Sequence, residues 1–526
     1  MLYGESPHST AAAAAVTIIR ILQRFLAPEM LMISLNVLAY FWTILATALS
    51  GYIILKYGLN TKDVAQRNAQ FRSLQRHFLT PYLSILLAES IQGPYLYVLY
   101  YAYGFLPAQI AVLYVVGLIM NVICTIFTVH LLSKYGRKVL CLCCVGTGSL
   151  ACLLKFSDNY LILLIGRLLD GFSAALIITP FQQWYGHEHV LSFDFPKEWM
   201  ASSVAVLSTS AGFLSVLAGL IAEFAESISS ITAFPFFFSI VFQLAGGLYI
   251  MRIWPENRLE PEHRVSMKQQ FTRSLSIFKV QKLVFSFSFE FEVEFLLQRK
   301  PAVLVLCVIH TLFESTMLIF IFVWTPLFIH TRTLFIERLS YGGIYASFMA
   351  FALLGSVTFR RFHKFISPTQ ALLGSSFIAL NSLGLTVMII PAKVTYWNLS
   401  LYQRLLILCC LFEFAVGVYL PAMSKLQAEL LPAEHRHALL AFLRIPLTLI
   451  SCFGMLFLHS HSTDWQIVVM GCILLSLCTL SSLLLHLAVG RTDRSKIDDH
   501  FVLQLTTEVP DDLDESSDVP ESLVIN

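Results

Sequence analysis

The sequence predicts an all-α protein that crosses a membrane many times, and three observations support this fold class. Of its 526 residues, 57% are hydrophobic and 13% are charged, whereas soluble domains carry about a quarter charged residues. Apolar runs of about 20 residues, enough to span a bilayer, follow one another along the chain. Lys and Arg concentrate in alternate connections between these runs. These features exclude a soluble enzyme, a nucleic-acid-binding protein and a disordered scaffold.

Thirteen apolar runs, separated by charged residues or proline, are the predicted transmembrane helices, and their partner is the lipid bilayer. Their approximate limits are 31–55, 78–102, 108–132, 139–155, 160–185, 200–224, 233–254, 301–329, 340–359, 370–391, 402–422, 437–459 and 466–488.

The positive charges of the connections predict the orientation. The segment 56–77 and every second connection after it hold 26 Lys and Arg residues, and the connections on the other side hold 6. Loops rich in Lys and Arg stay in the cytoplasm. The count therefore predicts an N-terminus outside and a cytoplasmic C-terminus.

Three further features lie at the ends or inside the spans. The N-terminal apolar stretch is too long for a typical signal peptide and favours a signal-anchor helix. The sequon at Asn398 lies on the predicted outer side, as N-glycosylation requires. The eleven cysteines all fall in apolar stretches without metal-ligand spacing, which indicates small core residues.

The twelve runs after the first form two sets of six that echo each other. Glu89-Ser90 and Glu314-Ser315 occupy the first helix of each set, and a basic connection follows each second helix. A Pro-x-Glu sequence precedes each fifth helix, although ordinary helix-start chemistry would also produce it. We interpret the pattern as a duplicated six-helix unit, as in the major facilitator fold, preceded by one extra N-terminal helix.

This organisation predicts five segments. They are an N-terminal segment with the extra helix and a cytoplasmic linker (1–77), an N-terminal six-helix bundle (78–254), a cytoplasmic central loop (255–300), a C-terminal six-helix bundle (301–488) and an acidic disordered cytoplasmic tail (489–526).

Ionisable residues inside the predicted spans are the first candidates for function, because a charge at the bilayer centre costs several kcal/mol unless it is paired or hydrated. Four of the six lie on different members of core helices 1, 4, 7 and 10, which line the central cavity in a major facilitator arrangement. The six are Glu89, Arg167, Asp170, Glu314, Glu413 and Arg444.

Structural roles compete with these functional ones. Arg167 and Asp170 are three residues apart on one helix and could neutralise each other. Arg444 lies near an inner helix end and could extend to the interface or pair with Glu434. Glu89 and Glu314 have no obvious local partner, which favours a role in a cavity.

Other motifs carry less chemistry. Gly136-Arg137-Lys138 forms a basic connection between two helices, and Gln182 and Gln183 offer amide donors at an inner helix end. His187-Glu188-His189 lacks the spacing of a zinc site and is predicted to lie in a solvated connection. No phosphate-binding loop or catalytic constellation occurs, so the sequence predicts no catalytic residue, metal, cofactor or ATP-driven pump, and therefore no enzyme.

Several motifs, in one order from about residue 80 to 490, resemble the molybdate-anion transporter family of the major facilitator superfamily. They are GPYLY (93–97), QIAVLY (109–114), GRK (136–138), GRL (166–168), FPKEW (195–199), LFES (312–315), WTP (324–326), SFMA (347–350), YLPAMS (419–424) and RIP (444–446). The resemblance implies a twelve-helix core that takes up molybdate, a tetrahedral dianion, across the cell membrane. The chain departs from the family pattern at Glu89-Ser90 and at Gln182-Gln183.

We therefore hypothesise a monomeric secondary transporter that alternates access to a central site. The oxyanion is expected to contact Arg167, Arg444, Gln182, Gln183, Ser90 and Ser315. We expect Glu89, Asp170, Glu314 and Glu413 to act in proton coupling or gating. We expect the loop motif at Gly136, Arg137 and Lys138 to take part in the conformational change. The alternatives are transport of sulfate, an organic anion or a sugar, a receptor or scaffold that moves no solute, and an integral membrane enzyme.

Overall fold

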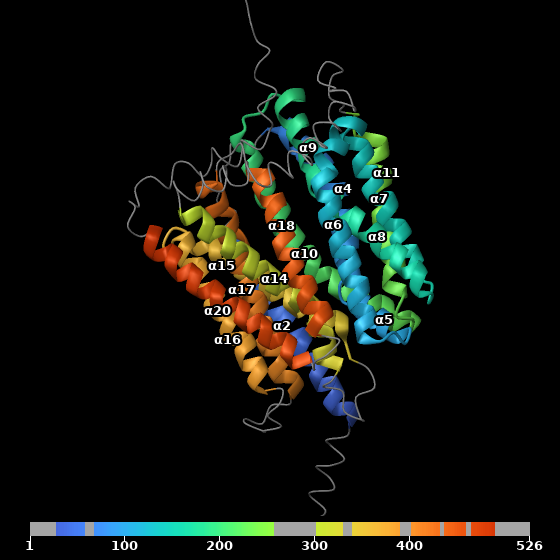
Figure 1. Cartoon of the computed structure of the whole chain (residues 1–526). Coiled ribbons are helices and arrows are strands. Elements are labelled where there is room, and N and C mark those ends of the chain that lie inside the picture. The colour runs from blue at the N-terminus through green and yellow to red at the C-terminus, as the bar shows by residue number, and fades with distance from the viewer. Residues whose placement is uncertain are drawn as a thin grey trace, which may run out of the picture.

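The computed structural model is helical throughout the part of the chain that it describes (Figure 1). It describes residues 28–57, 68–256, 301–329, 339–389, 401–431, 436–458 and 464–489. Asn398, most of the central loop and the C-terminal tail lie outside these residues, so the predictions made for them are not addressed by the structure.

The chain forms one extra helix, α2 (Pro28–Tyr57), and two sets of helices. The first set, called the N-half, comprises α4 (Ala69–Gln92), α5 (Leu96–Ala102), α6 (Pro107–Tyr135), α7 (Arg137–Leu154), α8 (Tyr160–Leu176), α9 (Thr179–His187), η1 (Glu188–Ser192), α10 (Glu198–Ser229) and α11 (Phe234–Ile253). The second set, called the C-half, comprises α14 (Pro301–Ile329), α15 (Tyr341–Phe362), α16 (Pro368–Ile389), α17 (Leu401–Leu430), α18 (Arg436–Phe453), η3 (Gly454–Leu458) and α20 (Asp464–Val489).

The helices of the two halves pair in the same way. In the N-half α4 packs against α11 and α10, α7 against α8 and α11, and α6 against α8. In the C-half α14 packs against α20 and α18, α16 against α17 and α20, and α15 against α17. Each of these five pairings in the N-half thus has a counterpart at the same helix positions in the C-half, as in a duplicated six-helix unit.

Eleven helices within the described residues are long and apolar enough to cross a membrane. Two of the thirteen predicted spans fall short. The span 78–102 is divided into α4 and α5, and the first turns of α4 are polar. The span 437–459 contributes a shorter apolar stretch, Leu443–Leu456, that continues from α18 into η3. The protein is therefore an all-helical, multi-pass membrane protein, and its thirteen-span count stays a prediction.

The break between α4 and α5 follows from Pro94. It lacks the amide N–H that would bond the Ser90 carbonyl one turn earlier, and its ring crowds that carbonyl, so the regular helix ends here. Gly93 presses against the ring of Tyr345 on α15, and a Cβ at Gly93 would lie 3.0 Å from that ring. The first core helix of the N-half therefore contacts the C-half at its break.

Two seams join the halves, and α10 and α18 lie between the two bundles in Figure 1. The seam between α10 and α15 is close because Gly219 and Gly342 face each other. A Cβ on Gly342 would collide with the carbonyl oxygen of Gly219 and lie 2.7 Å from the Cβ of Glu223. At the other end of this seam Arg360 donates to Thr209 (2.8 Å). The second seam joins α6 to α18.

The extra helix α2 packs mainly on α15. Its Thr43 hydroxyl shares a 3.0 Å hydrogen bond with Ser347, and Ala46 joins Val216 of α10 and Ala346 of α15 in one buried cluster. The extra helix therefore covers the α10–α15 seam rather than standing apart from the core.

One end of the molecule, called the linker end, is where α4 begins, α11 ends and α14 begins. The N-half is tightly built there. Gly136 has a φ of +92° at the turn between α6 and α7, a conformation that glycine adopts without steric cost. The Nζ of Lys138 donates to the carbonyl oxygens of Met251 (3.1 Å) and Trp254 (2.6 Å), which closes the end of α11.

The prediction that His187-Glu188-His189 is a solvated connection is wrong for two of the three residues. Glu188 and His189 are buried, since α9 continues into the helical turn η1 instead of ending. The His189 ring lies against the rings of Phe71 and Phe195, and its Nε2 is 2.9 Å from the carbonyl oxygen of Pro196.

Candidate functional site

Arg167 lies on α8, and its guanidinium contacts a carboxylate, a backbone carbonyl group, an aromatic ring and a glycine. Its Nη1 donates to Asp170 Oδ2 at 2.9 Å, and its Nε donates to the carbonyl oxygen of Leu113 at 3.2 Å. The guanidinium lies over the ring of Tyr114, 5.2 Å from its centroid. It also rests on Gly117, where a Cβ would lie 2.8 Å from Nη2. The local neutralisation of Arg167 by Asp170 considered from the sequence therefore exists.

Lys155, the last residue of the predicted span 139–155, is a second cation on the same carboxylate and is not among the candidate residues predicted from the sequence. Its side chain is 1% exposed, and its Nζ lies 2.8 Å from Asp170 Oδ2. The same Nζ donates to Gln92 Oε1 at 2.6 Å. A buried ammonium is stable only when it is paired and hydrogen bonded. The signal in the sequence is that Lys155 directly follows an apolar run, within reach of the bundle interior.

Glu89 continues this network on α4. Gln92 Nε2 lies 3.4 Å from Glu89 Oε2, so Gln92 connects Lys155 to Glu89. The Glu89 side chain is exposed, whereas Gln92 is buried. The neighbouring Gly93 contacts Tyr345, so this turn of α4 faces the C-half. The N-half thus holds two cations and two carboxylates in one connected chain.

Arg444 of the C-half contacts α6, the same helix that Arg167 of the N-half contacts. Its Nη1 lies 3.4 Å from Asn121 Oδ1 and 3.3 Å from Thr125 Oγ1, both on α6. The nearest contact points of the two arginines on α6, Gly117 and Asn121, are four residues apart, about 6 Å along the helix. The structure therefore brings the two predicted anion-binding arginines to successive turns of α6.

Glu314 has a local partner in the C-half, contrary to the expectation from the sequence. His310 Nδ1 lies 2.9 Å from Glu314 Oε1, one helical turn away on α14. Gln427 of α17 lies 3.4 Å from the same His310 nitrogen. The Glu314 side chain is 30% exposed and that of His310 is 10% exposed, so the pair is accessible from one side. The i,i+4 spacing in the sequence is a sufficient signal for this contact.

Glu413 lies buried on α17. Within the described residues, no hydrogen bond or ion pair involves its carboxylate. Tyr345 on α15 lies close enough to Glu413 and to Glu89 to interact electrostatically with both. The corresponding place in the N-half is held by Tyr114, which lies over Arg167 and packs on Phe322 of the C-half (5.2 Å between ring centroids). Each half thus places a tyrosine near a charged residue at an equivalent helix: Tyr114 lies near the cation Arg167 of core helix 4, and Tyr345 lies near the carboxylate Glu413 of core helix 10.

Three of the predicted substrate contacts lie elsewhere. Ser315 is fully buried, and its hydroxyl donates to the carbonyl oxygens of Thr311 (2.6 Å) and Leu447 (3.1 Å), which joins α14 to α18. Gln182 and Gln183 are on α9, beyond the end of α8 and about 20 Å along the chain from Arg167 at helical rise. None of these side chains adjoins the arginines.

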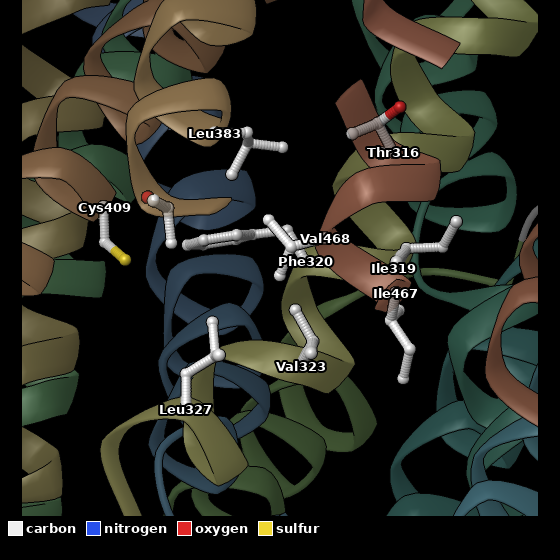
Figure 2. Close-up of a pocket in the computed structure, with 11 residues that line it drawn as sticks. Thr316, Ile319, Phe320, Val323, Leu327, Leu383, Cys409, Ile467 and Val468 are labelled. Carbon is white, nitrogen blue, oxygen red and sulfur yellow. The ribbon is translucent and has the colours of Figure 1, made fainter. Parts of the chain in front are cut away.

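Figure 2 shows a small pocket within the C-half, lined by apolar side chains from α14, α16, α17 and α20, among them Phe320, Leu383 and Ile467. Its hydroxyl groups are already used, because Thr316 donates to the Leu312 carbonyl at 2.9 Å. A pocket without a charged side chain does not suit an oxyanion, so this cavity is a packing gap and the charged residues are the stronger candidate site.

Glu223, which is not among the candidate residues predicted from the sequence, joins the halves at the end opposite the linker end. Glu223 Oε2 on α10 accepts hydrogen bonds from the Tyr95 hydroxyl (2.8 Å) and from the Gly342 amide at the start of α15 (2.9 Å). Tyr95 also packs on Tyr341 across the seam (6.3 Å between ring centroids). We call the cluster of Glu223, Tyr95 and Gly342 the latch.

The helices, their repeated pairing and the buried charges define a multi-pass membrane transporter. Residues 39–408 match a family model described as sugar transporters with 12 transmembrane segments. The molybdate-anion transporter of Takifugu rubripes is 33% identical over 447 residues, which cover 81% of this chain and 90% of that protein. The molybdate-anion transporter of Danio rerio is 32% identical over 448 residues, with 82% and 90% covered.

Solved structures show the same fold at low sequence identity. The nucleoside transporter NupG is similar with a TM-score of 0.56 and 10% identity, covering 80% of this chain and all of that one. A D-xylose-proton symporter is similar with a TM-score of 0.54 and 14% identity, covering 80% and 97%. The chain therefore belongs to the MFS_5 family of the major facilitator superfamily and is a transporter, not an enzyme. The family resemblance inferred from the sequence motifs is confirmed.

Proposed function

We propose that this protein is a secondary transporter that takes up molybdate across the cell membrane by alternating access. The observation that carries the proposal is that Arg167 of α8 and Arg444 of α18, one from each half, contact α6 at positions four residues apart, Gly117 and Asn121. The names of the relatives, molybdate-anion transporters over most of the chain, supply the substrate.

A tetrahedral oxyanion suits this pair of arginines. Guanidinium groups form strong, often bidentate hydrogen bonds to such anions, and they stay charged at any physiological pH. Arg167 is 12% exposed and Arg444 is partly buried, so both interactions would form away from bulk water. The hydroxyl of Thr125 and the amide of Asn121 lie beside Arg444 and can complete the hydrogen bonding.

Uptake of a dianion needs an energy source. Entry against an inside-negative potential is opposed by about 4.6 kcal/mol per 100 mV, since each charge contributes about 2.3 kcal/mol. Protons that enter with the anion offset this cost. Glu314, paired with His310, and Glu89 are the carboxylates that reach accessible space and can carry them.

The distribution of contacts between the halves supports an inward-facing conformer. The latch closes the end opposite the linker end. The aromatic ring contacts between the halves, within the described residues, are at this end too: Tyr95–Tyr341, Tyr97–Phe322 and Tyr114–Phe322. With the predicted topology, in which the linker end is cytoplasmic, the closed end is the outer one.

Uptake of radiolabelled molybdate by transport-deficient cells that express the protein tests this function, with unlabelled sulfate, tungstate and D-xylose as competitors. We expect accumulation that tungstate reduces and D-xylose leaves unchanged. No accumulation above that of cells without the protein contradicts the proposal. Displacement by the sugar alone would favour the alternative that the family description names.

Glu314→Gln tests the coupling. Uptake by the unmodified protein is expected to rise as the external pH falls. The variant is expected to show a weaker dependence, because only Glu89 still carries a proton, while it still reaches the membrane. An unchanged pH dependence in the variant contradicts a role of Glu314 in coupling.

A further inference from the structure

We propose that the chain of polar contacts from Glu89 through Gln92, Lys155 and Asp170 to Arg167 is a coupling device, in which protonation of Glu89 and binding of an oxyanion at Arg167 favour each other. Lys155 is its central positioning residue. The proposal rests on the proposed function and assigns a mechanism to one part of the same site.

The contacts form an unbroken series across three helices. Arg167 Nη1 to Asp170 Oδ2 is 2.9 Å, and Asp170 Oδ2 to Lys155 Nζ is 2.8 Å. Lys155 Nζ to Gln92 Oε1 is 2.6 Å, and Gln92 Nε2 to Glu89 Oε2 is 3.4 Å. Glu89 at one end is exposed, and Arg167 at the other end contacts α6, the helix that Arg444 also contacts.

Lys155 determines how the amide of Gln92 is oriented. An ammonium has only donors, so the oxygen of the Gln92 amide must face it. The amide nitrogen then points to Glu89, where it donates to the ionised carboxylate. Lys155 therefore supports the charged form of Glu89 as long as it holds Gln92 in place.

The charges of the network link the two events. Two cations and two ionised carboxylates give no net charge, and a proton on Glu89 leaves one net positive charge. A network with a positive charge attracts an oxyanion more strongly, whereas a dianion at Arg167 favours the protonated form of Glu89. Because a coupling free energy is reciprocal, each event strengthens the other by the same factor.

The groups that surround Glu89 leave it as the proton acceptor of the network. Asp170 is held by two cations, at 2.8 Å and 2.9 Å. Thiols and phenols are ordinarily neutral at physiological pH, with reference pKa values of about 8.5 and 10. The titratable groups that face Glu89 are Cys144, Cys152 and Lys155 from α7 and its end, Arg167 and Asp170 from α8, and Tyr345 from α15.

The test is calorimetric binding of molybdate to the purified full-length protein at several pH values, from acidic to neutral. The unmodified protein is expected to bind up to about tenfold more tightly for each unit of decreasing pH, the limit for one linked proton. Glu89→Gln removes the group that takes up the proton, and it is expected to reduce this dependence to less than about twofold per unit. Gln92→Leu removes a hydrogen bond to the ionised Glu89 carboxylate without a change of charge, and it is expected to move the pH dependence to a higher pH range. Lys155→Met is expected to reduce the dependence and also to weaken binding at acidic pH about tenfold or more, because a cation is lost.

Lys425→Met is the matched control, since Lys425 is also buried but pairs with Glu429 on α17, outside the network. It is expected to keep the pH dependence of the unmodified protein. If Gln92→Leu and Lys155→Met bind molybdate with the unmodified pH dependence, the coupling device is wrong and the proposed function stands. If the unmodified protein binds neither molybdate nor tungstate at any pH, both are overturned. Thermal unfolding of each variant shows whether it is folded. If the variants at buried positions unfold, Glu89→Gln, at an exposed position, still tests whether the pH dependence of molybdate binding needs Glu89.

Discussion

The latch gives the most detailed prediction about how the two halves move. Replacing Glu223 by Gln keeps the shape of the side chain and removes its negative charge. The carboxylate accepts hydrogen bonds from Tyr95 (2.8 Å) and from the Gly342 amide (2.9 Å). Hydrogen bonds to a charged group contribute about 1.5–3 kcal/mol, and neutral ones about 1 kcal/mol. The substitution therefore weakens the closed arrangement by about 1 to 2 kcal/mol, which increases the fraction of molecules open at this end about tenfold.

A cysteine reporter measures that fraction. Ala222 precedes Glu223 on α10 and is fully buried in this conformer, so a thiol at Ala222→Cys reacts with a water-soluble maleimide only when the end opens. The labelling rate, corrected for the protein without the reporter, is expected to rise about tenfold in Glu223→Gln. Glu198→Gln, an exposed acid at the other end of α10, is expected to change it less than about twofold. Equal labelling rates in Glu223→Gln and its parent would refute the latch.

Three further substitutions test single elements of the structure. Arg444→Ala is expected to lower molybdate uptake at least about tenfold per surface-exposed molecule, because the site needs a cation on α18 that faces α6. Arg444→Lys is expected to keep part of the uptake, since it keeps the cation. Retained uptake in the alanine variant would exclude Arg444 from the site. Gly342→Ala forces α10 and α15 apart, so it is expected to lower the free energy of unfolding by about 1–3 kcal/mol and to lower the melting temperature. Gly374→Ala, where the added Cβ meets free space, is expected to leave the melting temperature unchanged. Equal melting temperatures of the two variants would disprove the close seam. Gly136→Ala places a side chain at a φ of +92° and is expected to lower stability by about 1 kcal/mol or more, with Gly146→Ala as the unstrained control.

The fold could be predicted from the sequence as far as hydropathy is informative. A continuous apolar run such as the one that forms α6 is unambiguous, because the bilayer requires its length and composition. The break after Gln92 is marked in the sequence by Gly93-Pro94, but hydropathy does not show it, because apolar residues continue on both sides. The burial of His189 depends on aromatic rings from α4 and the 193–197 connection, which no local pattern reveals.

The candidate site could be predicted where partners are close in sequence. Arg167 and Asp170 are three residues apart, and the structure shows their ion pair. Lys155 was missed because its partners, Gln92 and Asp170, come from two other helices, and a lysine at the end of a span looks like a loop residue. The hydroxyl of Ser315 faces α18 instead of a cavity, since one turn of a helix points its residues in different directions.

Uptake into proteoliposomes tests the central claim most directly. Purified protein is reconstituted into sealed vesicles, a pH gradient with an acidic exterior is imposed, and the entry of radiolabelled molybdate is followed for the unmodified protein, Arg167→Gln and Lys425→Met. The account predicts accumulation that depends on the gradient in the unmodified protein and in Lys425→Met, and entry near the level of empty vesicles in Arg167→Gln. Equal accumulation in Arg167→Gln and the unmodified protein would contradict it.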